Sequence, residues 1–189
     1  YSKDVRSNIE TGGTFRLMNL IQQNSTLYDT VNAVHIHDFL SRPTVLELNA
    51  ISGDEQKALL IALLLIQISL YIKSKGASSG QLTNVILLDE AHILLGGNVD
   101  GQSGSKAKNS AVQLFQKMIA EIRSFGTSVI IADQAPSQVT RSIVANTDIK
   151  IAFRLVERDE CEIIANSTGM SNDYKEYLAR LQTGEAIAY

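Results

Sequence analysis

The sequence predicts an α/β fold in which a mostly parallel sheet is flanked by helices. From residue 43 onward, short apolar segments typical of strands alternate with longer segments of helical periodicity. Two of the short segments, 84–89 (NVILLD) and 127–134 (TSVIIADQ), are typical of buried strands, with apolar runs at 85–88 and 129–132. Such strands are usual in parallel sheets that are covered on both faces, where helices form the crossovers between strands.

The first part of this alternation follows an irregular region. Residues 1–42 lack strong periodicity, so we expect them to be irregular or partly helical. Residues 43–50 (PTVLELNA) are rich in branched side chains and favour a strand. Ser52 or Asp54 could then cap a long helix that extends to about Lys75.

The second part of the alternation begins with a loop rich in Gly, Ser and Asn at residues 96–109. A helix is expected from about Ser110 to Phe125, and Gly126 is placed to end it. Its apolar stripe consists of Val112, Phe115, Ile119 and Ile122. The remaining predicted elements are a helix at 137–145, a strand at 148–155, helices at 157–167 and 172–181, and a strand at 184–189.

The most apolar segment of the chain, residues 58–72, is predicted to be a core helix rather than a membrane span. Gln67 and Ser69 interrupt it, and Lys57 and Lys73 flank it. The segment is shorter than the roughly 20 apolar residues that a helix needs to cross a bilayer. We therefore expect no membrane-spanning segment.

Length and composition indicate one domain or most of one. The chain has 189 residues, 44% of them apolar, which is enough to bury a core. Its formal net charge of −3 argues against a surface that is basic throughout. The single cysteine, Cys161, excludes an internal disulfide and fits a reducing compartment, so a cytoplasmic location is expected. No secretory signal is seen at the start of the sequence. Because the chain begins with Tyr1 rather than methionine and its first forty residues lack strong periodic patterning, we expect a piece of a longer protein.

Polar side chains follow the two most apolar strands. Asp89 and Glu90 come after four aliphatic residues, which is the Walker B pattern. In that pattern the first carboxylate holds the shell of a magnesium ion, and the second orients and deprotonates an attacking water. Gln134 ends the next apolar strand and could sense a γ-phosphate or position that water. For Asp89 alone, a helix cap is an equally good interpretation.

Two arginines are candidates for stabilising charge in phosphoryl transfer. Arg123 lies near the end of the helix that precedes the Gln134 strand, and a neighbouring subunit commonly supplies such an arginine. A surface residue that favours a helix C-terminus is the alternative. Arg154 lies within the predicted apolar strand 148–155, which suggests a carboxylate partner or a subunit boundary.

Four segments together resemble a known family. VILLDEAH (85–92), MIAEIRSFGTSVIIADQAPSQV (118–139), TDIKIAFRL (147–155) and YLARLQTGEAIAY (177–189) are similar to the C-terminal half of the HerA/FtsK superfamily of RecA-like motor ATPases. The HerA-type and conjugation-type branches are most similar. The resemblance covers about residues 43–189 and implies a RecA-like P-loop NTPase fold that is truncated at its N-terminal side, with residues 1–42 as part of an inserted region.

The resemblance also implies roles and ligands. ATP and Mg²⁺ would be the cofactors, with Asp89 as the magnesium residue, acting through water, and Glu90 as the catalytic carboxylate. Gln134 would be the sensor, Arg123 the trans-acting arginine finger and Arg154 the second finger candidate.

The implied assembly is a homo-hexameric ring that translocates DNA through its pore, with a nuclease as a possible partner. Lys106 and Lys108, in the loop at 96–108, could then approach the DNA backbone, where lysines supply affinity that depends on salt. An ordinary solvated loop explains these lysines equally well.

One departure from the family pattern is important. No G-x-x-x-x-G-K-[ST] motif occurs in the sequence, and TGGTFRLMN (11–19) has neither the spacing nor the lysine. In this family that loop lies N-terminal to the segments seen here. The chain is therefore expected to be a fragment with half an active site and negligible ATP hydrolysis of its own.

Three other interpretations compete with the motor ATPase. The letters DEAH (89–92) invite a DEAH-box helicase, but the Ser-Ala-Thr and glutamine- and arginine-rich motifs of that class are absent, so His92 is expected only to pack or cap. His35 and His37 lie on one side of an expected extended segment, yet a metal site needs a third ligand. Finally, a catalytically inactive ATPase fold could serve as a scaffold or interaction module, and the missing phosphate loop supports it.

Overall fold

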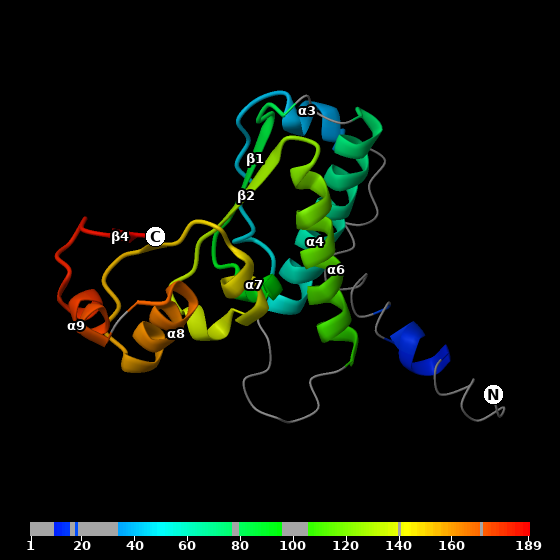
Figure 1. Cartoon of the computed structure of the whole chain (residues 1–189). Coiled ribbons are helices and arrows are strands. Elements are labelled where there is room, and N and C mark those ends of the chain that lie inside the picture. Colours follow the sequence, from blue (N-terminus) through cyan, green and yellow to red (C-terminus); the bar gives the residue numbers. More distant parts are fainter. Residues whose placement is uncertain are drawn as a thin grey trace. The chain divides into compact units, whose positions relative to one another are not determined.

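We describe the protein from a computed structural model, which covers residues 10–15, 18, 34–76, 80–95, 106–139, 141–170 and 172–189 (Figure 1). The chain divides into two compact units, Tyr1–Leu60 and Ile61–Tyr189. Each unit is described by itself below.

In the first unit, the described residues are helical or extended without a strand. Residues 10–15 are helical, and α3 spans Ile36–Leu40; most of the region 1–42, for which an irregular or partly helical structure was predicted, lies outside the described residues. The strand predicted at 43–50 is wrong: residues 43–48 belong to no helix or strand, residues 49–50 form a turn, and Val45 is 86% exposed. Branched residues form a strand only when a neighbouring strand pairs with their backbone, and the sequence pattern does not show that partner.

The two histidines of the HIH segment do not lie on one side of an extended segment. His37 belongs to α3, and its Nδ1 atom lies 3.1 Å from Oδ1 of the adjacent Asp38. This hydrogen bond lowers the pKa of the Asp38 carboxyl below its ordinary value. Within the described ranges, no three His, Cys, Asp or Glu side chains gather closely enough to hold a metal ion.

Helix α4 spans Asp54–Ser74, close to the predicted bounds, and follows Gly53, whose φ of +86° ends the preceding turn. In the second unit the helix is buried on one side only, although its side chains are apolar on both sides. Its buried side chains include Leu65, Ile68 and Ile72, whereas Leu63, Ile66 and Leu70 are exposed. By length and composition α4 could cross a membrane, a test that core helices also pass. Leu65 packs in the core of the second unit, while 22% of the apolar window of the helix is buried.

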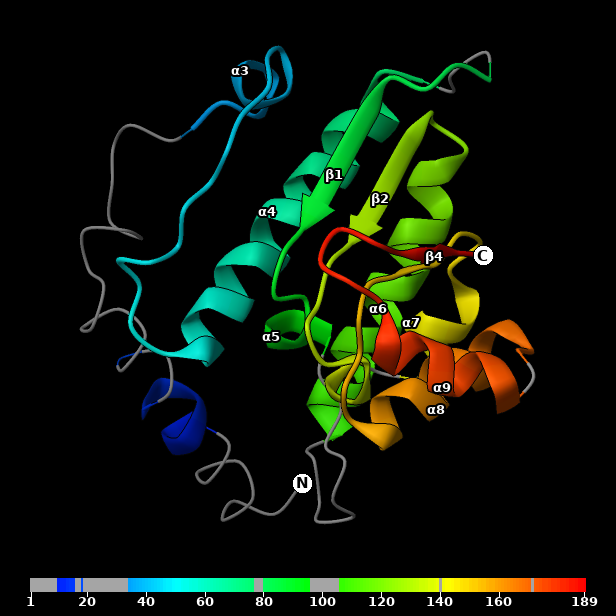
Figure 2. The same cartoon turned by 90° about the vertical axis from the view of Figure 1, so that its left-hand side faces the viewer.

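The central sheet of the second unit is a parallel pair. Strands β1 (Asn84–Leu88) and β2 (Thr127–Ile131) align from Asn84 opposite Thr127 to Leu88 opposite Ile131. Helix α6 (Lys106–Arg123) lies between them in the sequence, and α4 and α6 cover the same face of the pair (Figure 2). That face packs into one core, formed by Leu65, Ala91, Leu95, Phe115, Met118, Ile122, Val139 and Ile143 with Ile86, Leu88, Val129 and Ile131 against it.

The opposite face of the pair differs from the prediction that both faces are covered. Val85 and Leu87 on β1 and Ile130 on β2 are 54%, 61% and 47% exposed. The strands alternate in burial even though almost every side chain is apolar. Sequence alone therefore could not reveal which side chains face the core.

Helix α6 begins earlier than predicted. Its first residues include Lys106 and Lys108, so these lysines belong to the helix and not to the preceding loop, as their place in the sequence had suggested. Of the predicted stripe, Phe115 and Ile122 are buried, and the side chain of Val112 lies outside the described part of the structure. Gly126 ends the turn after the helix with a φ of +75°, a conformation that glycine adopts without strain.

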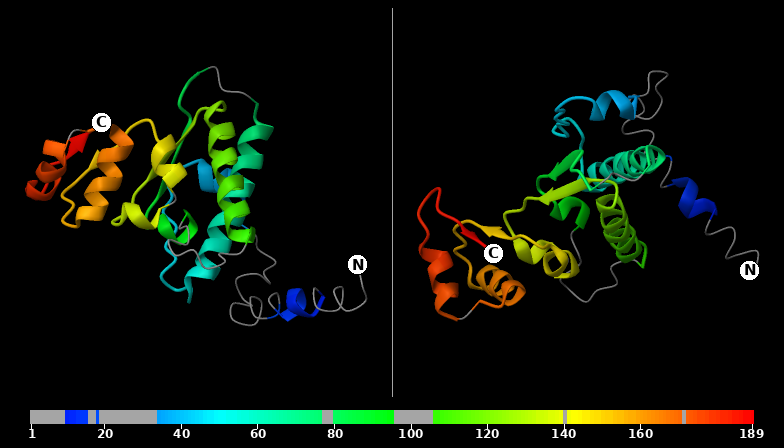
Figure 3. Two further views of the ribbon diagram at one scale, coloured as in Figure 1. Left: turned by 60° about the horizontal axis from the view of Figure 1, so that its bottom comes forward. Right: turned by 45° about the horizontal axis from the view of Figure 1, so that its top comes forward.

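The rest of the second unit is mainly helical (Figure 3). The predicted helix at 137–145 is split into a 3-10 turn, η1 (Pro136–Gln138), and α7 (Arg141–Asn146). Helices α8 (Arg158–Thr168) and α9 (Asn172–Arg180) lie close to the predicted bounds. They pack on a second core of Ala152, Cys161, Leu178 and Leu181.

The last two strands correct the prediction of a mostly parallel sheet. They are short, β3 at Ile151–Ala152 and β4 at Ile187–Ala188, and they pair antiparallel in a sheet of their own. The described chain thus has one parallel and one antiparallel pair. The apolar residues of these segments predict that each forms a strand, but they do not predict whether the two strands pair parallel or antiparallel.

Candidate active site at the carboxyl ends of the parallel strands

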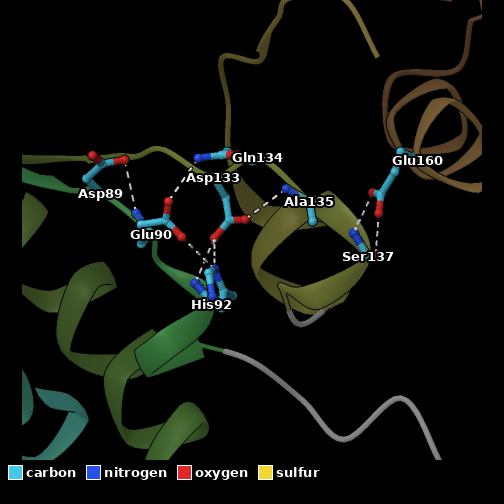
Figure 4. A network of polar contacts seen from close by, with 8 residues as sticks. All are labelled: Asp89, Glu90, His92, Asp133, Gln134, Ala135, Ser137 and Glu160. Carbon is cyan, nitrogen blue, oxygen red and sulfur yellow. Dashed lines mark hydrogen bonds and ion pairs between the residues drawn. The ribbon is translucent and has the colours of Figure 1, made fainter. Parts of the chain in front are cut away.

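The ends of β1 and β2 bring two polar segments together. The last residues of the strands, Leu88 and Ile131, lie opposite each other, and the N–H of Ala132 donates to the carbonyl of Leu88 at 2.8 Å. The N–H of Ala91 then donates to the carbonyl of Ala132 at 3.2 Å. Side chains that follow both strands therefore meet at one edge, which is where parallel sheets bind ligands (Figure 4).

Asp89 and Glu90 form a tight turn at this edge. Oδ1 of Asp89 accepts a hydrogen bond of 3.0 Å from the N–H of Glu90. Glu90 has a φ of +51°, in the left-handed region that costs a residue with a Cβ atom about 1 kcal/mol. Asp89 is exposed and Glu90 is half-buried.

Gln134 meets Glu90 across the two strands. Its Nε2 donates to Oε1 of Glu90 at 3.0 Å, although 44 residues separate them in the sequence. Asp89, Glu90 and Gln134 thus lie at one edge, as expected from their positions after parallel strands. Their proposed chemical roles stay predictions.

The sequence analysis did not identify Asp133, and it expected His92 only to pack or to cap a helix. Nδ1 of His92 lies 3.0 Å from Oδ2 of Asp133 and 3.5 Å from Oε2 of Glu90. The same Asp133 oxygen accepts the backbone N–H of His92 at 2.7 Å, and Oδ1 accepts the N–H of Ala135 at 2.9 Å. The Asp133 side chain is only 7% exposed. A carboxylate placed directly after an apolar strand was the available signal for Asp133.

A second carboxylate holds the turn that follows Gln134. Glu160 on α8 accepts a 2.8 Å hydrogen bond from the N–H of Ser137 and a second one from its hydroxyl group. Glu160 is 7% exposed. Helical periodicity predicted α8. The contact between Glu160 and η1 could not be predicted, because no local sequence pattern connects these two segments.

Comparisons with known proteins agree with the sequence resemblance. The chain is 32% identical over 105 residues to the DNA double-strand break repair helicase HerA of Sulfurisphaera tokodaii, covering 54% of this chain and 19% of that protein. It is 32% identical over 117 residues to the protein of the same name from Sulfolobus acidocaldarius, covering 61% and 22%. The resemblance to the HerA/FtsK-type motor ATPases is confirmed. The matches span only about one fifth of these HerA proteins.

The fold is similar to that of two solved viral NTPases. The genome packaging NTPase B204 of Sulfolobus turreted icosahedral virus 2, in complex with AMP, matches 84% of this chain and 68% of its own with a TM-score of 0.54 and 19% identity. The DNA-packaging ATPase B204 of Sulfolobus turreted icosahedral virus matches 97% and 85%, with a TM-score of 0.55 and 16% identity. No family model matches the chain. The HerA relatives and these NTPases together support an α/β ATPase fold.

The two candidate arginines lie on other elements than Asp89, Glu90 and Gln134. Arg123 ends α6 just before β2 begins, at the opposite end of that strand from Gln134. It is 76% exposed and pairs at 3.1 Å with Asp148, which is 71% exposed, an arrangement that stabilises a fold little. Arg154 follows β3 in an exposed, extended segment and makes no ion pair within the described part of the chain. The carboxylate partner expected for Arg154 is therefore not seen there.

Proposed function

We propose that this chain supplies the Walker B and sensor part of an ATP-hydrolysing DNA translocase of HerA type. The observation that carries the proposal is the Glu90 carboxylate, held between Gln134 and His92 at the carboxyl edge of a parallel strand pair. B204 is described in complexes with AMP, AMPPCP and ATP-gammaS, which supports a nucleotide as the ligand of this fold. The names of the HerA and B204 proteins support DNA as the partner.

The chemistry follows from the order of the side chains. Glu90 would orient a water molecule and accept its proton as the water oxygen attacks the γ-phosphorus and the bond to the β-phosphate oxygen breaks. Gln134, bonded to Glu90, would sense the γ-phosphate. The exposed carboxylate of Asp89 fits Mg²⁺, which takes one or two protein carboxylates and otherwise water and phosphate oxygens. When bound, the ion would neutralise charge on the phosphates.

The positions of the arginines favour a site shared between subunits. Arg123 is exposed and lies at the far end of β2, so it would act on the nucleotide of a neighbouring subunit. Arg154, exposed after β3, is a second candidate for that role. A head-to-tail homo-hexameric ring would provide such interfaces. Lys106 and Lys108, at the start of α6, would then be candidates for contact with DNA, and a nuclease could act beside the ring.

The phosphate-binding loop would come from outside the given sequence. The chain contains no Walker A motif, and it matches about one fifth of its HerA relatives. A site without that loop has neither the nest of backbone amides nor the lysine that hold the phosphates. We therefore expect the 189-residue chain alone to hydrolyse ATP negligibly. The same absence supports the second candidate, an inactive ATPase fold that serves as a scaffold.

The test is DNA-stimulated ATP hydrolysis by the complete gene product that carries this sequence. Wild type is compared with Glu90→Gln and Arg123→Ala, and the oligomeric state is measured on the same samples. Loss of at least about 100-fold in kcat in both variants, with the assembly intact, supports the motor. No turnover in the wild type, with or without DNA, supports the scaffold.

A further inference from the structure

The ring of His92 lies between two carboxylates of different burial. Asp133 is 7% exposed and approaches Nδ1 at 3.0 Å, while Glu90 is 45% exposed and approaches the same atom at 3.5 Å. Neither carboxylate can donate when ionised, so the proton between them must belong to His92. We therefore assign the hydrogen at this contact to Nδ1, because an ionised Asp133 carboxylate can only accept; the neutral Nδ1–H tautomer and the imidazolium ion both meet this condition.

Asp133 contacts both the backbone N–H and the ring of His92. One oxygen, Oδ2, accepts both the backbone N–H of His92 and its ring Nδ1. The other oxygen is occupied by the N–H of Ala135. A carboxylate that is nearly buried and accepts three hydrogen bonds has little freedom to rotate, so the position of the His92 ring is fixed by the end of β2.

Glu90 is in turn contacted on each of its two oxygens. Gln134 donates to Oε1 at 3.0 Å, and His92 lies 3.5 Å from Oε2. A half-exposed glutamate has several rotamers, and a contact on each oxygen selects among them. If Asp133 served only to cap the start of α5 (His92–Leu95), its hydrogen bond from the backbone N–H of His92 would be enough. A capping role does not explain the contact between the His92 ring and Glu90.

We propose that His92 and Asp133 are positioning residues for Glu90. Asp133 fixes the ring and the Nδ1–H of His92, and His92 together with Gln134 holds the Glu90 carboxylate in the direction required to orient water. This inference rests on the proposed function, since it assigns an orienting role to groups around the proposed catalytic carboxylate. It predicts that loss of the His92 ring slows turnover rather than weakens nucleotide binding.

Three substitutions of His92 separate positioning from packing. His92→Asn keeps an amide N–H near the place of Nδ1, whereas His92→Gln carries its amide farther out, near the place of Nε2. His92→Ala removes both. His92 is only partly buried, with 29% of its side chain exposed, so these variants are expected to fold. Asp133→Asn would place an NH2 group against one or two of the three donors and is expected to destabilise the fold, so the test uses His92 variants.

The experiment measures DNA-stimulated ATP hydrolysis and Tm for the complete gene product in wild type, the three His92 variants and Glu90→Gln. We expect His92→Ala and His92→Gln to lower kcat by about tenfold with KM for ATP within about twofold, and His92→Asn to recover most of the rate. Equal kcat in wild type and His92→Ala, or equal loss in His92→Asn and His92→Gln at unchanged Tm, would overturn the inference.

Two further results separate this inference from the proposed function. If Glu90→Gln is inactive while His92→Ala matches wild type, the positioning role fails and the ATPase stands. If Glu90→Gln keeps full turnover, the proposed function fails and the positioning role fails with it. Nitrogen NMR of the 189-residue chain tests the contact without activity: a proton on Nδ1 is expected, and the neutral Nε2–H tautomer would overturn the contact.

Discussion

Glu160 on α8 receives two hydrogen bonds from Ser137, one from the backbone N–H at 2.8 Å and one from the hydroxyl group. Ser137 lies in η1, the turn that begins two residues after Gln134. Both partners come from elements of the second unit that are distant in sequence. Glu160 therefore anchors the chain immediately after the proposed sensor.

Removal of this anchor should destabilise the fold. We expect Glu160→Ala to lower the free energy of unfolding of the chain by about 1–3 kcal/mol, because it leaves the N–H of Ser137 without its acceptor in a partly buried place. Urea unfolding followed by circular dichroism measures the change. The matched control is Glu157→Ala, since Glu157 precedes α8 and makes no side-chain cap. Equal stability of the two variants would contradict the anchoring role.

The ion pair between Lys73 on α4 and Glu121 on α6 should make stability depend on pH. The hydrogen bond from Lys73 lowers the pKa of the Glu121 carboxyl below its ordinary value. A depressed pKa in the folded state means that the pair stabilises the fold above the ordinary pKa of glutamate, and that this stabilisation is lost as pH falls through the folded pKa.

The variant that tests this ion pair is Glu121→Gln. It is expected to lower Tm at neutral pH and to approach the wild type in acid, where the wild-type carboxyl is also neutral. Thermal unfolding across that pH range measures the difference. Glu176→Gln, on the exposed surface of α9, serves as the control. A difference between Glu121→Gln and wild type that stays constant down to acid pH would contradict the assignment.

Cys161 should be protected in the folded chain. It is 5% exposed, its Sγ lies 3.3 Å from the carbonyl oxygen of Leu155, and burial raises the pKa of its thiol. Both effects reduce the reactive thiolate, so alkylation by iodoacetamide is expected to be about 100-fold slower than in denaturant. Mass spectrometry of timed samples measures the rate. A second thiol introduced by Ser124→Cys, at an exposed position, should react rapidly in the same molecule.

The sequence predicted the elements of the second unit better than their pairing. Helices α8 and α9 follow from local periodicity, and the long helix Asp54–Ser74 and the strands β1 and β2 follow from the length and flanks of their apolar runs. The direction of β4 does not, because it depends on β3, more than thirty residues earlier in the sequence. The candidate strand at 43–50 fails for the same reason, since no partner is encoded locally.

The candidate site shows the same division. Asp89, Glu90 and Gln134 could be predicted because each follows an apolar strand at the edge where parallel sheets bind ligands. The part played by His92 could not, because it depends on the buried carboxylate of Asp133 on another strand end. A histidine next to an acidic pair gives no local sign of its second partner. Contacts between segments, and not residue types, carry that information.

The location of Arg123 leads to a prediction about mixed assemblies. Arg123 and Gln134 lie at opposite ends of β2, so a single subunit does not join the arginine to Glu90. If the finger acts in trans, Arg123→Ala subunits still carry Glu90, and Glu90→Gln subunits still carry Arg123. Each variant alone should be inactive. In random rings of the two, about one quarter of the head-to-tail interfaces would contain both intact residues.

Co-expression of the two variants with different affinity tags, followed by tandem purification, isolates such mixed rings for ATPase assays. We expect a recovery of turnover toward one quarter of the wild-type rate, if interfaces act independently. The control pairs Arg123→Ala with the double variant Glu90→Gln/Arg123→Ala, a mixture that contains no intact arginine and should stay inactive. An arginine that acted in cis would give no recovery in either mixture, and full activity of Arg123→Ala alone would transfer the finger role to Arg154.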